Sequence, residues 1–233
     1  MKKILFLLLI AASQISNAQS DAQAVDILNK FITACGGTEK LAAVKSMIRK
    51  MESSTPFGSG ENETLYKNGK FYAKTTMGGN VVMEQKYDGN RAYVNGMQGS
   101  QTIDDEKQLK QYSSQGKPFP LLDFEKSGAT YKLAGTEKID GKDCNKIVAT
   151  DKDGESSNLF FDASTNLLAR MSQKRDFQGQ EVESIFDFGD YKAVEGILFA
   201  HMMKLNLGQF AIDMKLIEVK INPEIADKTF LIE

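Results

Sequence analysis

The sequence predicts a mainly β fold: an antiparallel meander of about ten to twelve strands that bends round on itself, with an N-terminal helix and a mid-sequence helical lid. Two observations lead to this fold class. Turn pairs such as Asn68-Gly69 and Asp88-Gly89 separate runs rich in Phe, Tyr, Val, Ile and Thr, which is typical of consecutive hairpins. The adjacent Phe160 and Phe161 also send large apolar groups to both sides of one strand. Because the few helical segments cannot cover such a sheet, it must curve.

The first segment, residues 1–18, is an expected export signal. Two lysines precede an apolar run at 4–12, and Ser16 and Ala18 supply the small residues of a signal-peptidase site. The apolar run is well short of the ~20 residues that span a bilayer, so we expect cleavage before Gln19.

The mature chain, 19–233, is expected to form a single domain. It contains no internal repeat, low-complexity tract or proline-rich linker. Its net charge of −2, with Lys and Arg spread along the chain, gives no reason to expect nucleic acid as a partner. The cleaved product is expected to be a soluble monomer, located in the periplasm if the host is bacterial.

An amphipathic helix is expected at the start of the mature chain. Leu28 and Ile32 belong to an apolar stripe with helical spacing. Asp21 can cap the start of this helix, and Gly36 follows its end. Thr38 is expected to cap a short second helix. Both helices are expected to pack on the strands that follow.

The strand pattern is interrupted between residues 103 and 124. Leu109 and Tyr112 have the spacing of a short helix, and Pro118 and Pro120 exclude a central strand. We interpret this segment as a lid or crossing segment inserted into the meander.

The inward faces of the strands are expected to be soft and apolar. Ten Met, fourteen Phe and no Trp would make an adaptable lining, because Met conforms to irregular partners. An ordinary close-packed core, with no ligand cavity, explains the same residues equally well. The candidates for a lipid-binding cavity are Phe71, Met83, Leu159, Phe161, Met171, Phe186, Phe188, Phe199, Met203 and Met214.

The residues of a catalytic or metal site are not recognisable in the sequence. The single His, His201, alternates with apolar residues on an expected strand, and no serine lies in a nucleophile elbow. One His and two distant Cys do not make a zinc site, and the acidic stretch 151–155 fits a hairpin turn better than a calcium loop. We therefore expect no enzyme, no metal and no cofactor.

The two cysteines, Cys35 and Cys144, are expected to be buried free thiols. Cys35 occupies an apolar helix position where a small hydrophobe packs. A disulfide between the two is the alternative, because an exported protein meets an oxidising compartment.

Five stretches together carry a resemblance to a known family. They are "DILNKFITACGGTEKLAAVKSM" near the start, "YDGNRAYV", "LFFDASTNLLARM", "FDFGDYKAVEGILFAHMMKL" and "INPEIADKTF". These loose turn-and-strand patterns cover nearly all of the mature chain, which resembles the outer-membrane lipoprotein-sorting family, the LolA/LolB-like superfamily. It is most similar to the exported versions in Bacteroidota-type bacteria.

The resemblance implies an incomplete, strongly curved antiparallel barrel in which the N-terminal helix and the lid enclose a hydrophobic cavity. It also implies a non-enzymatic carrier or chaperone for the acyl chains of lipoproteins or other lipids, with membrane-bound donor or acceptor proteins as further candidate partners. The family's carrier uses a strand Arg near its lid, and Arg49 and Arg91 are the candidates here. The alternative is a cell-envelope scaffold domain whose cavity is filled by its own lid.

Overall fold

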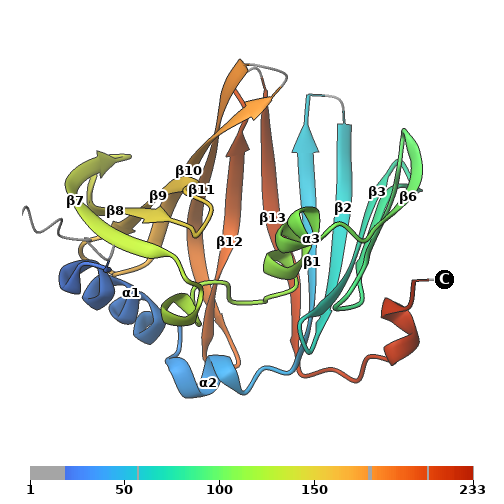
Figure 1. The fold of residues 1–233 in the computed structure, drawn as a ribbon, viewed down its shortest axis with the longest axis horizontal. Helices are drawn as coiled ribbons and strands as arrows, with labels where there is room; N and C mark the ends of the chain where they lie inside the picture. Colours follow the sequence, from blue (N-terminus) through green and yellow to red (C-terminus); the bar gives the residue numbers. More distant parts are fainter. Residues whose placement is uncertain (1–18, 57, 178–179, 209, 233) are drawn as a thin grey trace, which may run out of the picture.

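The computed structural model of the protein describes residues 19–56, 58–177, 180–208 and 210–232, so the expected export signal lies outside the described residues. These residues form one 13-stranded antiparallel sheet with a few short helices (Figure 1). The sheet is strongly curved and is not closed, because β6 and β7 form its two edges. The predicted fold class is confirmed, with one strand beyond the predicted number. In the part of the chain that is described, none of the helices is both long and apolar enough to cross a bilayer.

The sheet follows the chain in a simple order. The strands are β1 (Ser46–Thr55), β2 (Gly58–Lys67), β3 (Lys70–Met77), β4 (Asn80–Tyr87), β5 (Ala92–Gly96), β6 (Gly99–Ile103), β7 (Thr130–Ile139), β8 (Lys142–Thr150), β9 (Ser156–Asp162), β10 (Leu168–Phe177), β11 (Gln180–Val194), β12 (Ile197–Asn206) and β13 (Ala211–Ile221). Neighbours in sequence are neighbours in the sheet, except that β1 pairs with β13 at its centre and the edge strands β6 and β7 do not pair. The segment between β6 and β7 therefore runs from one edge of the sheet to the other.

The helical segments are α1 (Ala22–Ala34), α2 (Thr38–Ala42), α3 (Glu106–Gln115), and the single turns η1 (Phe124–Lys126) and η2 (Asp227–Phe230). The helices and η1 lie on the concave side of the sheet or at one end of it, whereas η2 lies outside the sheet beside β3 (Figure 1). Asp21 caps α1 as predicted, because its carboxylate accepts a hydrogen bond from the Gln23 amide at 2.9 Å. The predicted cap of the second helix is wrong. Gly37 is the N-cap of α2, and Thr38 is the first helical residue.

The lid follows the prediction and closes one end of the concave face. Tyr112 of α3 is buried and stacks on Phe71 of β3, with ring centroids 6.5 Å apart. Phe119, just after α3, packs against Phe199 of β12 at a centroid distance of 6.0 Å. We call this the closed end. Its deepest inward row crosses six strands and comprises Met47, Tyr66, Phe71, Tyr87, Ala92 and Ile103, all buried.

The adjacent Phe160 and Phe161 of β9 are both buried, on opposite faces of the sheet. Phe161 points inward and packs against Phe31 of α1, with ring centroids 5.3 Å apart. Phe160 belongs to a small separate cluster with Ile139 and Cys144. The Lys146 ammonium lies 5.4 Å from the centroid of the Phe160 ring. Side chains of neighbouring strands therefore cover Phe160 on the outer face, without a second layer of helices or strands.

Candidate functional site

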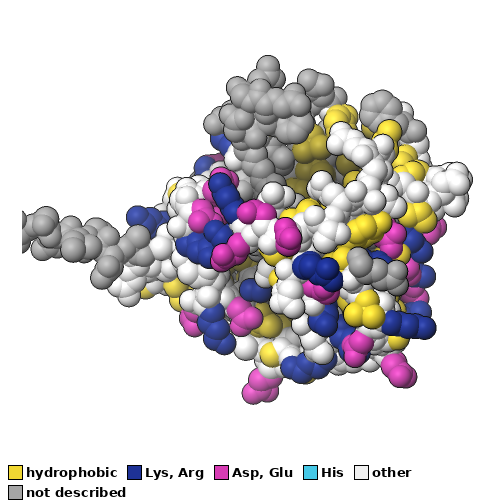
Figure 2. All heavy atoms as spheres, turned by 45° about the vertical axis from the view of Figure 1, so that its right-hand side comes forward, with side chains coloured by type: hydrophobic (Ala, Val, Ile, Leu, Met, Phe, Trp, Pro, Cys, Tyr) yellow, Lys and Arg dark blue, Asp and Glu magenta, His cyan; other side chains and the backbone are white. Residues whose placement is uncertain are grey.

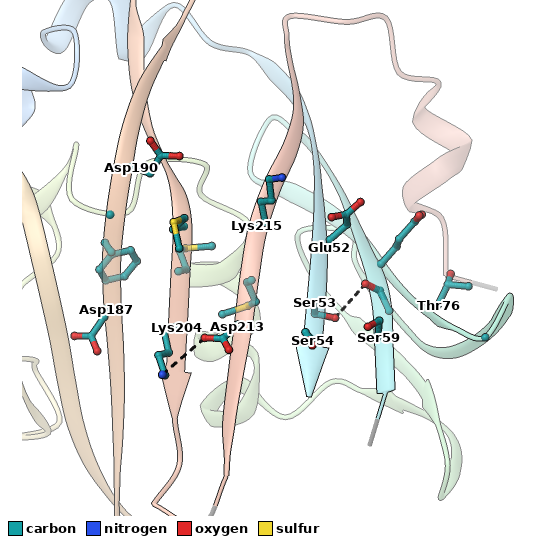
Figure 3. Close-up of a pocket in the computed structure, with 18 of the residues that line it drawn as sticks. Glu52, Ser53, Ser54, Ser59, Thr76, Asp187, Asp190, Lys204, Asp213 and Lys215 are labelled. Atoms are coloured by element: carbon teal, nitrogen blue, oxygen red, sulfur yellow. Dashed lines mark hydrogen bonds and ion pairs between the residues drawn. The ribbon is translucent and has the colours of Figure 1, made fainter. Parts of the chain in front are cut away.

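A cavity of about 1130 Å³ lies at the other end of the concave face, between the hairpin ends of the central strands (Figure 3). We call this the open end. One inward row forms its floor, and the pairing register aligns that row across five strands: Phe188, Met203, Met214, Ser53 and Gly60. Outward residues of the same strands also line it, among them Glu52, Asp187, Lys204, Asp213 and Lys215 (Figure 3). In Figure 2, hydrophobic side chains are visible within the hollowed upper part of the molecule.

The cavity floor changes character from one side to the other. On β11 to β13 it is apolar and thioether-rich, and a second apolar row continues it toward the hairpin ends. This second row comprises Ile147, Leu159, Met171, Phe186, Leu205 and Ile212, paired in register across β8 to β13. Such a wall suits flexible hydrocarbon chains, because Met adapts to irregular apolar partners.

Several inward side chains on β1 to β3, beyond the packed closed end, are polar. Ser53 donates a hydrogen bond to the Gly60 carbonyl at 3.3 Å. Asn62 donates to the Thr75 hydroxyl at 3.1 Å and accepts from the Thr64 hydroxyl at 3.1 Å. We call Ser53, Asn62, Thr64 and Thr75 the polar wall. Sequence reasoning missed it, although these residues alternate with others at the two-residue period of a strand.

Two buried side-chain nitrogens lie between the closed end and the cavity. Within the described ranges, Arg49 Nε and His201 Nε2 are the two buried side-chain atoms that have no hydrogen-bond partner. Arg49 shares its face with Met47, Met51 and Ser53 on β1, and His201 lies between Phe199 and Met203 on β12. A buried polar group without a partner costs roughly 1–3 kcal/mol.

The structure distributes the ten predicted lining residues over three regions. Phe188, Met203 and Met214 line the cavity. Leu159, Met171 and Phe186 lie in the adjacent apolar row. Phe71, Phe161 and Phe199 are buried against helices or the lid, and Met83 faces inward on β4 but is 44% exposed. Their role as ligand contacts remains a prediction.

The two candidate arginines occupy different places. Arg49 faces the concave side and donates a hydrogen bond from Nη2 to the Tyr66 hydroxyl at 3.0 Å. Arg91 lies near the edge of the sheet, where its Nη2 donates to the Ile232 carbonyl at 2.7 Å and so holds the C-terminal segment. Of the two, only Arg49 lies on a strand whose residues line the cavity.

The cysteines and acidic side chains do not come together into a catalytic or metal site within the described residues. Cys35 and Cys144 are buried and unbridged, as the sequence predicts. In the part of the chain that the structure describes, no three His, Cys, Asp or Glu side chains are grouped so that they could hold a metal ion. The stretch Asp151–Glu155 is a turn, because the Asp151 carboxylate accepts from the amides of Asp153 and Glu155, each at 2.9 Å.

The open half-barrel with a helical lid and an apolar cavity defines a class of fold, and solved structures share it. The chain matches a LolA superfamily protein from Nitrosomonas europaea at 14% identity and TM-score 0.60, over 89% of this chain and 97% of the other. A putative outer membrane lipoprotein-sorting protein domain from Vibrio parahaemolyticus matches at 12% identity and TM-score 0.59, over 89% and 96%. A DUF1329 family protein from Desulfovibrio piger matches at 14% identity and TM-score 0.60, over 89% and 97%.

These similarities establish a LolA-like fold, so the predicted resemblance is confirmed at the level of fold. The sequence matches no protein-family model and no curated protein.

Proposed function

We propose that this protein is a non-enzymatic carrier or chaperone that binds the acyl chains of lipoproteins or other lipids at the open end of its half-barrel. The observation that carries the proposal is the cavity itself. After the helices and lid have packed, about 1130 Å³ remains, at or above the roughly 300–1,000 Å³ of ordinary ligand pockets. Each methylene of an acyl chain buried there would contribute about 0.8 kcal/mol.

The chemistry of the cavity fits this ligand class. Three large apolar side chains, Phe188, Met203 and Met214, form one side of the cavity floor. Hydrocarbon binding needs neither a nucleophile nor a metal. The scaffold alternative requires a cavity filled by the lid, whereas the lid contacts described above lie at the closed end.

The proposed location is the periplasm, with the mature chain beginning at Gln19 and acting as a monomer. The lysines, apolar run and small residues of 1–18 support export. N-terminal sequencing of the protein recovered from its native host tests this. We expect the first residue to be Gln19, and an intact Met1 on a membrane-bound product would contradict the proposal.

The binding test compares three aspartate variants of the mature chain. Met203→Asp places a charge on the cavity floor and should weaken binding of a fluorescent fatty acid at least tenfold, about 1.4 kcal/mol, while a cooperative thermal transition remains. Met97→Asp is the control: Met97 lies in the turn between β5 and β6, is 99% exposed and does not line the cavity, so its variant should bind like the unmutated protein.

Phe161→Asp tests the boundary between cavity and core. Phe161 is fully buried against Phe31, so an aspartate there should destabilise the fold by roughly 3–5 kcal/mol or prevent folding. If the unmutated mature chain bound no acyl ligand, the carrier proposal would be removed and the scaffold alternative would stand.

A further inference from the structure

We infer that the cavity selects amphipathic lipids whose head carries an anionic oxygen group, a carboxylate or a phosphate, and that Arg49, on β1 between the closed end and the cavity floor, receives this group. The inference rests on the proposed acyl-binding function and adds the ligand's head group to it. Four observations carry it, taken in turn below.

The first is the position of the two unpartnered nitrogens. Along β1 the inward residues run from Met47 at the closed end through Arg49 and Met51 to Ser53 in the cavity. Along β12 they run from Phe199 at the closed end through His201 to Met203 in the cavity. His201 therefore lies level with Met51, and Arg49 lies one row deeper, between the packed closed end and the cavity.

The second is the state of the Arg49 side chain. Its Nη2 is occupied by the Tyr66 hydroxyl, and its guanidinium carbon lies 5.7 Å from the centroid of the Tyr66 ring. Its Nε is buried and has no partner within the described residues, and no ion pair is recorded for it there. A guanidinium offers only donors, so a buried Nε–H calls for an acceptor oxygen.

The third observation concerns the polar groups near the Arg49 side chain. Tyr66 accepts from Arg49 through its oxygen, which leaves its own O–H free to donate. His201 Nε2 is a second buried nitrogen without a partner, on β12, two strands away in the sheet order and one row nearer the cavity. One anionic oxygen group with several lone pairs can accept from the Arg49 Nε–H and the Tyr66 O–H together.

The fourth is the division of the concave face. The polar wall continues from Arg49 across β2 and β3, whereas β8 to β13 present the two apolar rows. A head group held at Arg49 leaves its acyl chain to run over Met203, Met214 and Phe188 toward the open end. An apolar side and a polar side, with a cation at their boundary, match a lipid with a charged head.

The test measures displacement of a neutral phenylnaphthylamine probe from the mature chain by three ligands of equal chain length: hexadecanoate, hexadecyl phosphate and hexadecanol. We expect at least one of the two anions to bind at least tenfold more tightly than the neutral alcohol, since a charge-assisted hydrogen bond in a desolvated site contributes that much. Whether the carboxylate or the phosphate is preferred identifies the source of the anionic group.

Arg49→Gln should reduce the preference for the anion to twofold or less and leave alcohol binding unchanged. The matched control is Lys50→Gln, which removes the same charge from the next residue. Lys50 points to the outer face, where it pairs with Glu63 at 3.4 Å and Glu218 at 3.3 Å, and its variant should keep the full preference. His201→Phe should also reduce the preference for the anion over the alcohol. This second test does not depend on whether the Arg49 variant folds.

The possible failures are distinct. If probe and alcohol bind but the anions bind no better, the Arg49 inference is overturned and the carrier proposal stands. If Arg49→Gln and Lys50→Gln lower the preference equally, the effect comes from net charge and the inference is again overturned. If neither probe nor any lipid binds, the carrier proposal itself fails and the inference fails with it.

Discussion

At the residue scale, burial decides the chemistry of the two cysteines. Burial raises the pKa of the Cys35 thiol to about 12. Burial, and then the nearby charge of Asp162, raise the pKa of Cys144 as well. A thiol is nucleophilic only as the thiolate, so both side chains should be inert in the folded protein. They serve packing, Cys35 at the end of α1 and Cys144 on the outer face.

Thiol labelling checks this. At pH 8 an aromatic disulfide reagent should modify neither Cys35 nor Cys144 in the folded, unreduced protein, and should modify both after unfolding in denaturant. Two reactive thiols after unfolding are therefore the expected count. Finding none would show that the cysteines are bridged.

The pH dependence of stability gives a second prediction for Cys35. Its folded pKa is raised above the ordinary value of 9.0, so the unfolded chain releases its proton first as the pH rises. The stabilisation is complete below about pH 8.5 and is lost progressively as the pH rises toward 12. Between pH 9 and pH 11 the unfolding free energy of the unmutated protein should therefore fall relative to that of Cys35→Ala. Denaturant titrations of both proteins at several pH values measure the difference, and a constant difference would contradict the assignment.

At the element scale, the lid is held by three contacts of different kinds. Tyr112 stacks on Phe71, and Gly116 lies so close to the β2–β3 turn that a Cβ would overlap the Gly69 carbonyl oxygen. Lys110 of α3 forms an ion pair with Asp153 in the β8–β9 turn, with Nζ to oxygen distances of 2.9 and 3.1 Å. The ion pair joins the lid to the opposite half of the sheet.

Asp153→Asn should loosen the lid with little effect on global stability. Both partners are well exposed, so the pair contributes little to global stability. Its loss should favour the open lid modestly, and release of a bound fluorescent fatty acid should accelerate up to about fivefold. Stopped-flow measurements check this, and molar salt should abolish the difference.

The control is Asp143→Asn, which breaks the more exposed ion pair between Lys138 and Asp143 on the β7–β8 hairpin, away from α3. Its ligand release rate should be unchanged. Equal acceleration in both variants would show that the Lys110–Asp153 pair has no specific part in lid motion.

At the scale of the whole molecule, the two halves of the sheet meet at one strand pair. The half formed by β1 to β6 and the half formed by β7 to β13 join through β1 and β13, which come from opposite ends of the mature chain. The connection between β6 and β7 crosses the concave face without strand pairing. Cooperative folding therefore depends on bringing together β1 and β13, two strands that are far apart in the sequence.

Ending the chain before Ala211 removes β13 and should abolish the cooperative transition, because β1 and β12 would each become an exposed edge and the halves would separate. Calorimetry of the truncated protein measures this. The control is the chain 19–233, which keeps all thirteen strands and should give a single transition. A cooperative transition in the truncated protein would show that the halves fold independently.

The sequence by itself determined the local structure of this protein. Turn pairs such as Asn68-Gly69 fix where strands end, because each requires a backbone with positive φ that Asn and Gly tolerate. Asp21 fixes the start of α1, and the spacing of Leu109 and Tyr112 gives the lid helix. These features depend on neighbouring residues only, which is why they could be predicted.

Only the tertiary structure decided which inward residues form a core and which line a cavity. Phe161 and Met203 have the same apolar character and the same period in the sequence, yet Phe161 packs on α1 whereas Met203 faces the cavity. The difference depends on where α1 and α3 dock, far from these strands in sequence. Likewise, Arg49 and His201 both lie between the closed end and the cavity only because β1 and β12 both pair with β13. Pairing over such long sequence separations leaves no local pattern to detect, since a strand's period fixes its two faces but not what covers them.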